Sequence, residues 1–284
     1  MSINLNNLKK PYLIAEVGIN HNGDLQIVKK LIDAVFACSW DCVKFQKKNP
    51  DLCVPEQQKR VIKETPWGEI SYLEYKHRLE FGKKEYDYID RYCKEKPLSW
   101  AASVWDIDSL NFIKQYDVAF IKIPSAKVTD LELISKVAQT EQAIILSTGM
   151  STLEEIDMAV EILRKYHSKF ALMHTNSSYP TKIEDINIMC INTLRERYGC
   201  EVGYSGHEYG LDSTTIAVSL GAMVVERHIT LDHSMWGTDH RSSIEIQGMD
   251  KLYKQINSAT KILGDGNKNV SEDEKAIRLK LRGY

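Results

Sequence analysis

The chain has 284 residues, with 37 Lys and Arg against 39 Asp and Glu, which gives a formal net charge of -2. This balance argues against a nucleic-acid or membrane-surface protein, because such proteins usually carry a basic excess. No stretch approaches the ~20 apolar residues of a membrane-spanning helix, and no signal-peptide pattern opens the sequence. We therefore expect a cytoplasmic protein that binds neither nucleic acid nor membrane, whose six cysteines are free and mostly buried.

Short apolar runs alternate with longer amphipathic stretches along the chain. Eight runs have the length and composition of buried strands: Tyr12 to Val17, Cys42 to Phe45, Trp100 to Ser103, Ala119 to Ile123, Ala143 to Leu146, Phe170 to Met173, Glu201 to Tyr204 and Met223 to Glu226. Apolar residues at helical spacing predict the helices between them: Asp24 to Cys38, Ile107 to Gln115, Leu131 to Ala138, Ser151 to Tyr166, Asp185 to Tyr198, Ser213 to Leu220 and Asp250 to Leu263. Ser151 and Glu154 fit a capping box at the start of one of them.

Eight apolar strands, each followed by a helix, predict an α/β protein with a (β/α)8 TIM barrel as a single domain over residues 1–263. A doubly wound sheet would suit fewer strands, and no G-x-G-x-x-G motif opens the first helix. Residues 264–284 form a charged tail, for which we expect a final helix packed on the barrel or on a partner. The connection from Lys47 to Gly82 is too long for an ordinary loop and predicts a lid or a subunit contact.

Polar side chains stand at the ends of all eight predicted strands, where barrels of this kind place their active sites. They include Glu16, Lys44, Gln46, Ser103, Lys122, Ser125, Ser147, Thr148, His174, Ser205, His207, Glu226 and His228. Residues two apart on a strand face the same side, so Lys44 and Gln46 both point into the barrel mouth.

Two lysines inside apolar strands predict an anionic ligand such as phosphate or carboxylate, because lysine is rarely buried without a partner. The alternative is a pair of internal salt bridges from these lysines to Glu16 and Glu226. His207 and His228 end adjacent strands and can share a divalent ion, although a histidine at a strand end is more often a hydrogen-bonded structural residue. Surface positions are expected for four other histidines: His21, His167, His233 and His240.

Several segments resemble the sialic acid synthase family, which also includes legionaminate and pseudaminate synthases. In chain order they are Ile14 to Asp24, Lys44 to Gln46, Lys122 to Ser125, Leu146 to Met150, His174 to Pro180, Gly203 to His207 and Glu226 to His228. The resemblance covers residues 11–263, and its motifs are specific to the family rather than to one sugar.

The resemblance implies a synthase that joins phosphoenolpyruvate to an aldose such as N-acetylmannosamine, with water, giving a 3-deoxy-2-ulosonic acid and phosphate. It implies a homodimer and a divalent ion on His207 and His228, with manganese expected and magnesium and cobalt as alternatives. Catalytic roles fall on Glu16, His228 and Asp239. The positions implied to bind phosphoenolpyruvate are Lys44, Ser103, Lys122, Ser125, Ser177 and Ser205; those implied to face the sugar are Gln46, Tyr179 and Asp239.

The sequence departs from the best-known family members, which carry a small C-terminal antifreeze-like domain that contacts the sugar. The printed chain stops before such a domain, so we expect a short form in which the Lys47 to Gly82 connection supplies sugar contacts. Three alternatives stay open: a synthase of another 3-deoxy-ulosonate such as an octulosonate, a Schiff-base aldolase using Lys122 or Lys44, and a non-catalytic sugar-binding barrel.

Overall fold

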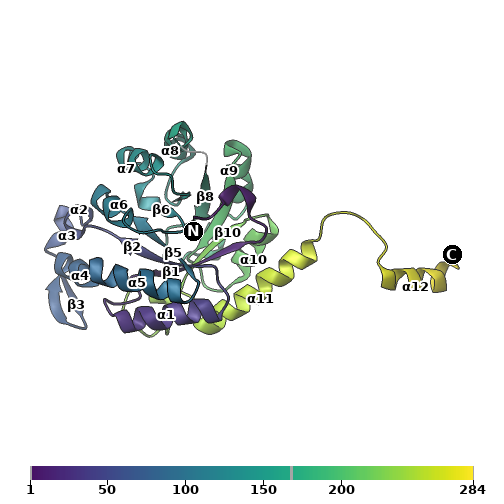
Figure 1. The fold of residues 1–284 in the computed structure, drawn as a ribbon, viewed down its shortest axis with the longest axis horizontal. Helices are drawn as coiled ribbons and strands as arrows, with labels where there is room; N and C mark the ends of the chain where they lie inside the picture. The colour runs from purple at the N-terminus through teal and green to yellow at the C-terminus, as the bar shows by residue number, and fades with distance from the viewer. Residues whose placement is uncertain (1, 167–168, 284) are drawn as a thin grey trace.

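The computed structural model describes residues 2–166 and 169–283, so His167 lies outside the described residues. Figure 1 shows a barrel of strands ringed by helices, with a tail that extends away from it. The strands of the barrel are β1 (Tyr12–Gly18), β2 (Cys42–Lys47), β5 (Ser99–Val104), β6 (Ile121–Ile123), β7 (Ile144–Ser147), β8 (Phe170–Thr175), β9 (Glu201–Gly206) and β10 (Val224–His228). All pairings are parallel, and the closed order β1-β10-β9-β8-β7-β6-β5-β2 confirms the predicted single-domain TIM barrel.

Helices cover the outside of the barrel. They are α1 (Leu25–Ala37), α5 (Lys83–Glu95), α6 (Ile107–Ile113), α7 (Leu131–Ala138), α8 (Leu153–Tyr166), α9 (Cys190–Tyr198), α10 (Asp212–Ser219) and α11 (Ile246–Leu263). Helix α5 was not predicted, and α9 begins at Cys190 rather than Asp185 because the 3-10 turn η3 (Ile183–Asp185) takes up the start of that stretch. The capping box lies one residue later than predicted, because Glu155 N–H donates to Thr152 Oγ1 and Thr152 N–H to Glu155.

The inside of the barrel is apolar at the bottom and polar at the top. Because side chains alternate between the two faces of a strand, each inward series has a period of two residues. Ile14, Cys42, Ala101, Ile145, Ala171 and Val224 form the apolar layer, with Leu5 from the turn η1 (Leu5–Asn7). The next inward positions of β1, β2 and β10 are Glu16, Lys44 and Glu226, which pair in register with neighbouring strands. The alternation of inward and outward side chains that fills the barrel with apolar groups thus also places a polar layer at its mouth.

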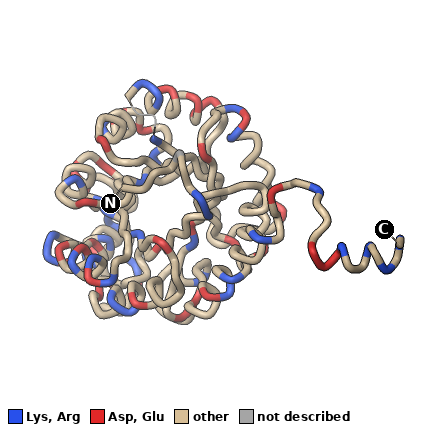
Figure 2. The backbone as a smooth tube through the Cα atoms, turned by 45° about the vertical axis from the view of Figure 1, so that its right-hand side comes forward, with Lys and Arg blue, Asp and Glu red and all other residues tan. Residues whose placement is uncertain are grey.

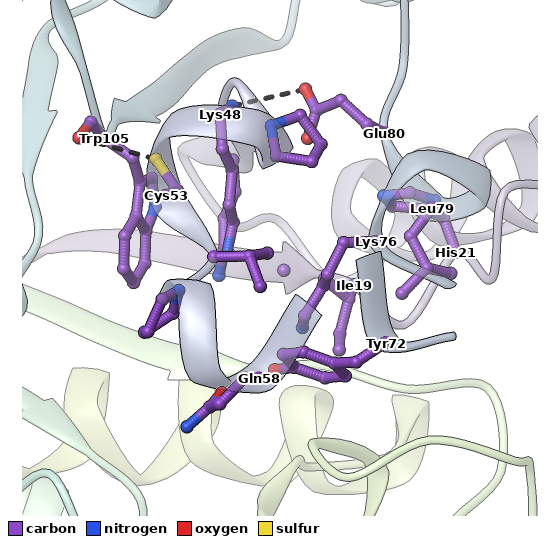
Figure 3. A pocket seen from close by; sticks show the side chains of 15 residues that line it. Ile19, His21, Lys48, Cys53, Gln58, Tyr72, Lys76, Leu79, Glu80 and Trp105 are labelled. Carbon is purple, nitrogen blue, oxygen red and sulfur yellow. Dashed lines mark hydrogen bonds between the residues drawn. The ribbon is translucent and has the colours of Figure 1, made fainter. Parts of the chain in front are cut away.

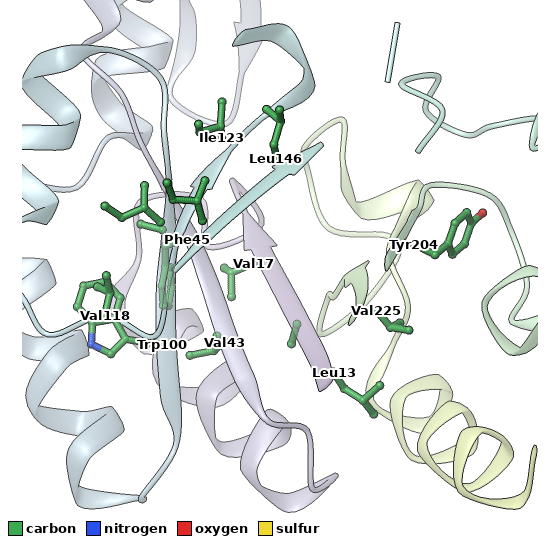
Figure 4. Close-up of a cluster of buried hydrophobic side chains, with 14 of the residues drawn as sticks. Leu13, Val17, Val43, Phe45, Trp100, Val118, Ile123, Leu146, Tyr204 and Val225 are labelled. Carbon is green, nitrogen blue, oxygen red and sulfur yellow. The ribbon is translucent and has the colours of Figure 1, made fainter. Parts of the chain in front are cut away.

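The outward strand side chains form the main hydrophobic core beneath the helices. Figure 4 shows Val43, Phe45 and Trp100 packed together on one side of the barrel. Each is no more than 3% exposed, and burying a side chain of this size contributes roughly 1.5–3 kcal/mol. This layer fixes the strands rigidly, so the polar side chains at their ends are held in defined positions.

The long connection after β2 is an ordered insertion, defined here as residues 48–82. It contains α2 (Pro50–Cys53), α3 (Glu56–Lys59), the antiparallel hairpin β3 (Ile62–Thr65) and β4 (Gly68–Ser71), and α4 (Tyr72–Leu79). Its own small core centres on Ile70, Tyr75 and Leu79. Tyr75 and Trp67 contact the Trp236 ring edge-on, with centroids 5.3 and 6.1 Å away. The insertion therefore packs against the loop between β10 and α11.

The predicted tail helix is present as α12 (Glu272–Arg282), but it does not pack on the barrel. No residue of α12 is buried, and Figure 1 shows it separated from α11 by an extended segment. Figure 2 shows that positively and negatively charged residues are mixed along the outer helices and the tail. Within residues 2–166 and 169–283, no helix has the length and apolar character needed to cross a membrane.

Candidate active site

One cavity at the barrel mouth gathers almost all of the predicted site residues. All eight barrel strands and the loops after them line this central cavity, through Glu16, Lys44, Gln46, Ser103, Trp105, Lys122, Ser125, Ser147, Thr175, Ser177, Tyr179, Ser205, His207, Glu226 and His228, among others. Thr148 and His174, also named among the polar strand-end residues, lie outside this lining, and His174 Nε2 is 2.7 Å from the Ile186 carbonyl oxygen. Asp239, to which the resemblance gave a catalytic role, is also outside the lining. It lies at the rim, where its Oδ2 is 4.0 Å from His228 Nδ1.

Two buried lysines lie beside two buried glutamates in the central cavity. Lys44 Nζ is 2.5 Å from Glu16 Oε2 and 3.5 Å from Glu226 Oε1. Lys122 Nζ is 2.8 Å from Glu226 Oε2. The salt bridges considered as an alternative to an anion site are thus present. They do not use up the cations, because an ammonium has three donors and Lys122 makes only this hydrogen bond among the described residues.

Hydroxyl groups extend this charged network. Lys44 Nζ donates to Ser103 Oγ at 3.0 Å, and Ser205 Oγ donates to Glu226 Oε1 at 3.2 Å. Glu226 therefore connects both lysines and Ser205, which makes it the hub of the site. The sequence placed Glu226 at a strand end and as a counter-ion, but gave it no role in the site.

The two glutamates have opposite proton affinities. Burial raises the pKa of Glu16 above its usual value, and the neighbouring Glu226 carboxylate adds to this rise. Burial would also raise the pKa of Glu226, but Lys122 and Lys44 outweigh it and lower the value to about 2. Glu226 therefore stays ionised at neutral pH. When two neighbouring carboxyl groups have well-separated pKa values, one stays charged and the other can take up and release a proton. Here Glu226 is the charged group and Glu16 is suited to carry the proton.

His207 and His228 lie side by side, with ring centroids 5.4 Å apart. His207 Nδ1 is 2.6 Å from the Asn176 carbonyl oxygen, so Nδ1 carries the proton and Nε2 accepts, here from Tyr179 Oη at 2.9 Å. His228 Nδ1 is buried and has no hydrogen-bond partner among the described residues. Burial lowers the pKa of each histidine to about 4, so both are neutral at pH 7.

These features fit a divalent ion. Neutral imidazoles with one nitrogen oriented by a backbone carbonyl are the form in which histidine binds metals. Within the described part of the chain, no three His, Cys, Asp or Glu side chains are grouped to hold a metal. An ion held by His207 and His228 would therefore take its other ligands from water or substrate, which suits a catalytic site rather than a structural one.

Two serines share a small polar space on the other side of the cavity. Ser125 Oγ accepts a hydrogen bond from Gly149 N–H at 3.0 Å. A Cβ atom at Gly149 would lie 2.3 Å from Ser177 Oγ and 3.0 Å from Ser125 Oγ. Any side chain at position 149 would thus fill the space that the two hydroxyls face. The sequence motif included Gly149, but its steric role is visible only in the structure.

The predicted sugar-facing residues lie around the histidines. Gln46 Nε2 donates to Glu16 Oε1 at 2.9 Å, and the Tyr179 ring stacks on His207 with centroids 4.0 Å apart. Gly18 has a φ of +55°, and a Cβ there would come within 3.3 Å of both His228 and Gln46. The absence of a side chain at Gly18 therefore allows His228 and Gln46 to lie this close to the backbone.

Two histidines expected at the surface are buried instead. His21 stacks on Phe81 with centroids 4.0 Å apart and is 4% exposed. His240 is fully buried, with Nδ1 2.7 Å from Thr230 Oγ1. His21 follows β1 and is covered by Phe81 of the insertion, whereas His240 is buried within the β10–α11 connection. Such tertiary contacts are not visible in local sequence.

Comparison with known proteins agrees with this geometry. The NeuB family profile matches residues 31–268. The chain is 35% identical over 272 residues to the N,N'-diacetyllegionaminic acid synthase of Campylobacter jejuni subsp. jejuni, covering 94% of this chain and 81% of that protein. It is 39% identical over 249 residues to the N-acetylneuraminate-9-phosphate synthase of Drosophila melanogaster, covering 86% and 67% of the two chains.

A solved structure is similar over almost its whole length. It is the N-acetylneuraminic acid (sialic acid) synthetase from Leptospira borgpetersenii serovar Hardjo-bovis, with a TM-score of 0.86 and 31% identity, covering 97% of this chain and 94% of that one. The family match covers most of the chain, and the relatives are similar over the whole barrel. The chain therefore belongs to the NeuB family of nonulosonic acid synthases and is an enzyme of the transferase class.

Proposed function

We propose that the central cavity joins phosphoenolpyruvate to an aldose of the N-acetylmannosamine type, with water, to give a 3-deoxy-2-ulosonic acid and phosphate. The observation that carries this proposal is the pair of buried lysines, Lys44 and Lys122, beside the pair of histidines, His207 and His228, in one cavity. Cations suit the carboxylate and phosphate of one substrate, and the histidine pair suits the carbonyl of the other.

In this proposal, the anionic substrate lies against the lysines and serines. Lys122 has donors to spare, and the hydroxyls of Ser103, Ser125, Ser177 and Ser205 face the same cavity. The negative charge of Glu226 holds both ammonium groups in place without competing for all of their protons. Because these groups are fixed before the substrate arrives, little reorganisation is needed at the moment of reaction.

The carbon–carbon bond forms between the enol carbon of phosphoenolpyruvate and the aldehyde carbon of the open-chain sugar. Glu16, whose pKa is raised by burial, donates a proton to the aldehyde oxygen in one step and accepts one from the water that adds at C2 in a later step. Loss of phosphate from the resulting tetrahedral carbon completes the reaction. Gln46 orients Glu16 through the 2.9 Å hydrogen bond between them.

His207 and His228 would hold the divalent ion, for which manganese is the expected species and magnesium and cobalt are alternatives. When bound, such an ion polarises a carbonyl oxygen or a water molecule. Asp239, at 4.0 Å from His228 Nδ1, orients that ring or contacts the sugar. A homodimer and a cytoplasmic location stay predictions.

The test is phosphate release from phosphoenolpyruvate with manganese across a panel of aldoses: N-acetylmannosamine, diacetamido-hexoses, arabinose, and their phosphate esters. We expect release with one sugar, abolished by a chelator and by His207→Ala. His233→Ala, which removes a histidine that is 49% exposed, serves as the matched control and should keep full activity.

Two outcomes would contradict the proposal. Release only with arabinose or arabinose 5-phosphate would favour the octulosonate type of synthase. Covalent trapping of Lys122 or Lys44 by borohydride, with no metal requirement, would favour the aldolase. The ion pairs of both lysines with glutamates argue against that second outcome, because a nucleophilic lysine must lose its proton.

A further inference from the structure

A second cavity opens beside the central one, beneath the insertion. This insertion cavity is lined by Gly18, Ile19, His21, Gln46, Lys48, Pro50, Cys53, Val54, Pro55, Gln58, Tyr72, Lys76, Leu79, Glu80 and Trp105. Figure 3 shows the Lys48 and Lys76 side chains extending into it, between Trp105 and Tyr72. Nothing in the proposed reaction uses these two lysines.

The two cavities share a wall. Gln46 and Trp105 line both of them, and Gly18, which lines the insertion cavity, lies against His228 without a side chain to separate them. The histidine pair lies in the central cavity next to this shared wall, so a sugar whose aldehyde carbon lies at His207 and His228 would extend its far end past Gln46 and Trp105 towards the insertion cavity.

The cations of the insertion cavity lack direct counter-ions. Neither Lys48 Nζ nor Lys76 Nζ forms an ion pair within the described residues, whereas the neighbouring Lys47 is paired with Glu80 at 2.6 Å. Lys48 Nζ lies 3.9 Å from the centroid of the Trp105 ring. Lys76 Nζ lies 5.0 Å from the ring centroid of Tyr72 and 5.1 Å from that of Tyr75. Aromatic faces thus hold both ammonium groups in place of carboxylates.

The electrostatic state of the cavity favours an incoming anion. Burial, together with the nearby charge of Lys76, lowers the pKa of Lys48 to about 8, and burial also lowers the pKa of Lys76. The Trp105 indole N–H is buried and has no hydrogen-bond partner among the described residues. Two under-compensated cations and a spare donor match the charge and acceptors of a phosphate monoester.

We propose that Lys48 and Lys76 bind a phosphate ester at the end of the acceptor sugar distant from its aldehyde, so the acceptor is a phosphorylated aldose. This inference rests on the proposed function, because it places the aldehyde at His207 and His228. The insertion would then determine which sugar is accepted, whereas the reacting carbons lie in the central cavity.

The first experiment compares kcat/KM for each sugar of the panel with that for its phosphate ester, in the wild type and in Lys48→Gln and Lys76→Gln. We expect the phosphorylated sugar to be preferred, and each substitution to lower kcat/KM for it by about 10- to 100-fold, as for a lost charge-assisted hydrogen bond. The KM for phosphoenolpyruvate should stay within about twofold. Lys59→Gln is the matched control, because Lys59 lies in the same insertion and is paired with Glu56 at 2.8 Å.

A binding measurement separates failure of this inference from failure of the proposed function. N-acetylmannosamine 6-phosphate is titrated calorimetrically into chelator-treated protein saturated with phosphoenolpyruvate, so turnover is not required. Binding that is lost in Lys48→Gln and Lys76→Gln, and kept in Lys76→Arg and Lys59→Gln, supports the inference. Absence of binding, binding that is unchanged in both glutamine variants, or equal turnover of the two forms of each sugar overturns it.

Discussion

At the scale of single residues, Glu226 sets the charge balance of the central cavity, because its carboxylate contacts both Lys122 and Lys44. Glu226→Gln keeps the shape but leaves two buried ammonium groups with only Glu16 as a counter-ion. Removing one partner of a buried ion pair usually costs about 3–5 kcal/mol. We therefore expect the free energy of unfolding, measured by chemical denaturation at pH 7, to fall by about that amount.

The same variant separates structure from ligand binding. Saturating phosphoenolpyruvate should restore stability to Glu226→Gln more than it raises that of the wild type, because the ligand brings the missing negative charge. An equal increase in both proteins would mean that phosphoenolpyruvate does not lie against these lysines.

His21 makes stability depend on pH. Burial lowers its pKa to about 3, from about 6.5 in an unfolded chain. Between these values the unfolded chain binds a proton that the folded protein does not, so the free energy of unfolding decreases as the pH falls from 6.5 towards 3.

His21→Asn should weaken this dependence, because the amide oxygen can replace Nδ1 as the acceptor of the Gly23 N–H. The slope of unfolding free energy against pH should decrease by up to about 1.4 kcal/mol per pH unit between pH 6 and 4.5. His77→Gln removes a half-exposed histidine of α4 as a comparison. Parallel slopes for His21→Asn and the wild type would show that His21 takes up its proton in the folded state.

At the scale of elements, the insertion and the β10–α11 loop meet through aromatic rings. Trp236 contacts Tyr75 and Trp67 of the insertion, and the same loop carries Asp239. Trp236→Ala should weaken the packing of the insertion against this loop. Aromatic pairs contribute about 0.5–1.5 kcal/mol beyond their buried area, so we expect the KM for the sugar to rise by up to about tenfold in steady-state assays.

The KM for phosphoenolpyruvate should change by less than about twofold in Trp236→Ala, because the lysines and serines of the central cavity stand on barrel strands. Tyr88→Ala breaks a stacked pair on α5 instead and should leave both constants unchanged. Equal increases in both KM values for Trp236→Ala would mean that the loop supports the whole mouth.

At the scale of the whole molecule, the barrel and the tail are separable. Residues 264–283 are all exposed, and α12 has no buried side chain. A chain ended after Gly264 should therefore unfold within about 2 °C of the full chain, which corresponds to less than about 1 kcal/mol. Thermal unfolding at two protein concentrations checks this. A larger, concentration-dependent decrease would show that the tail packs on a partner.

The sequence predicted the barrel because each strand is a short apolar run. The period of two residues placed Lys44 and Gln46 at the mouth, and Glu226 and His228 were expected there because they end the last strand. Local pattern marked the connection from Lys47 to Gly82 as unusual but could not predict its structure, because its elements are only four to eight residues long and contact the distant Trp236. The insertion cavity was missed for the same reason. Lys48 and Trp105 come together there from segments that are separate in the sequence.

The closure of the barrel also bears on how the chain is made. The first strand, β1, pairs with the last, β10, so that Tyr12 meets Val224. During synthesis, β1 keeps one edge without a partner until residues 224–228 have left the ribosome. Unpaired strand edges are sites of aggregation, and pairings so distant in sequence form slowly. The nascent chain is therefore exposed longest at the strand that carries Glu16, which makes β1 the segment where chaperone binding should concentrate during translation.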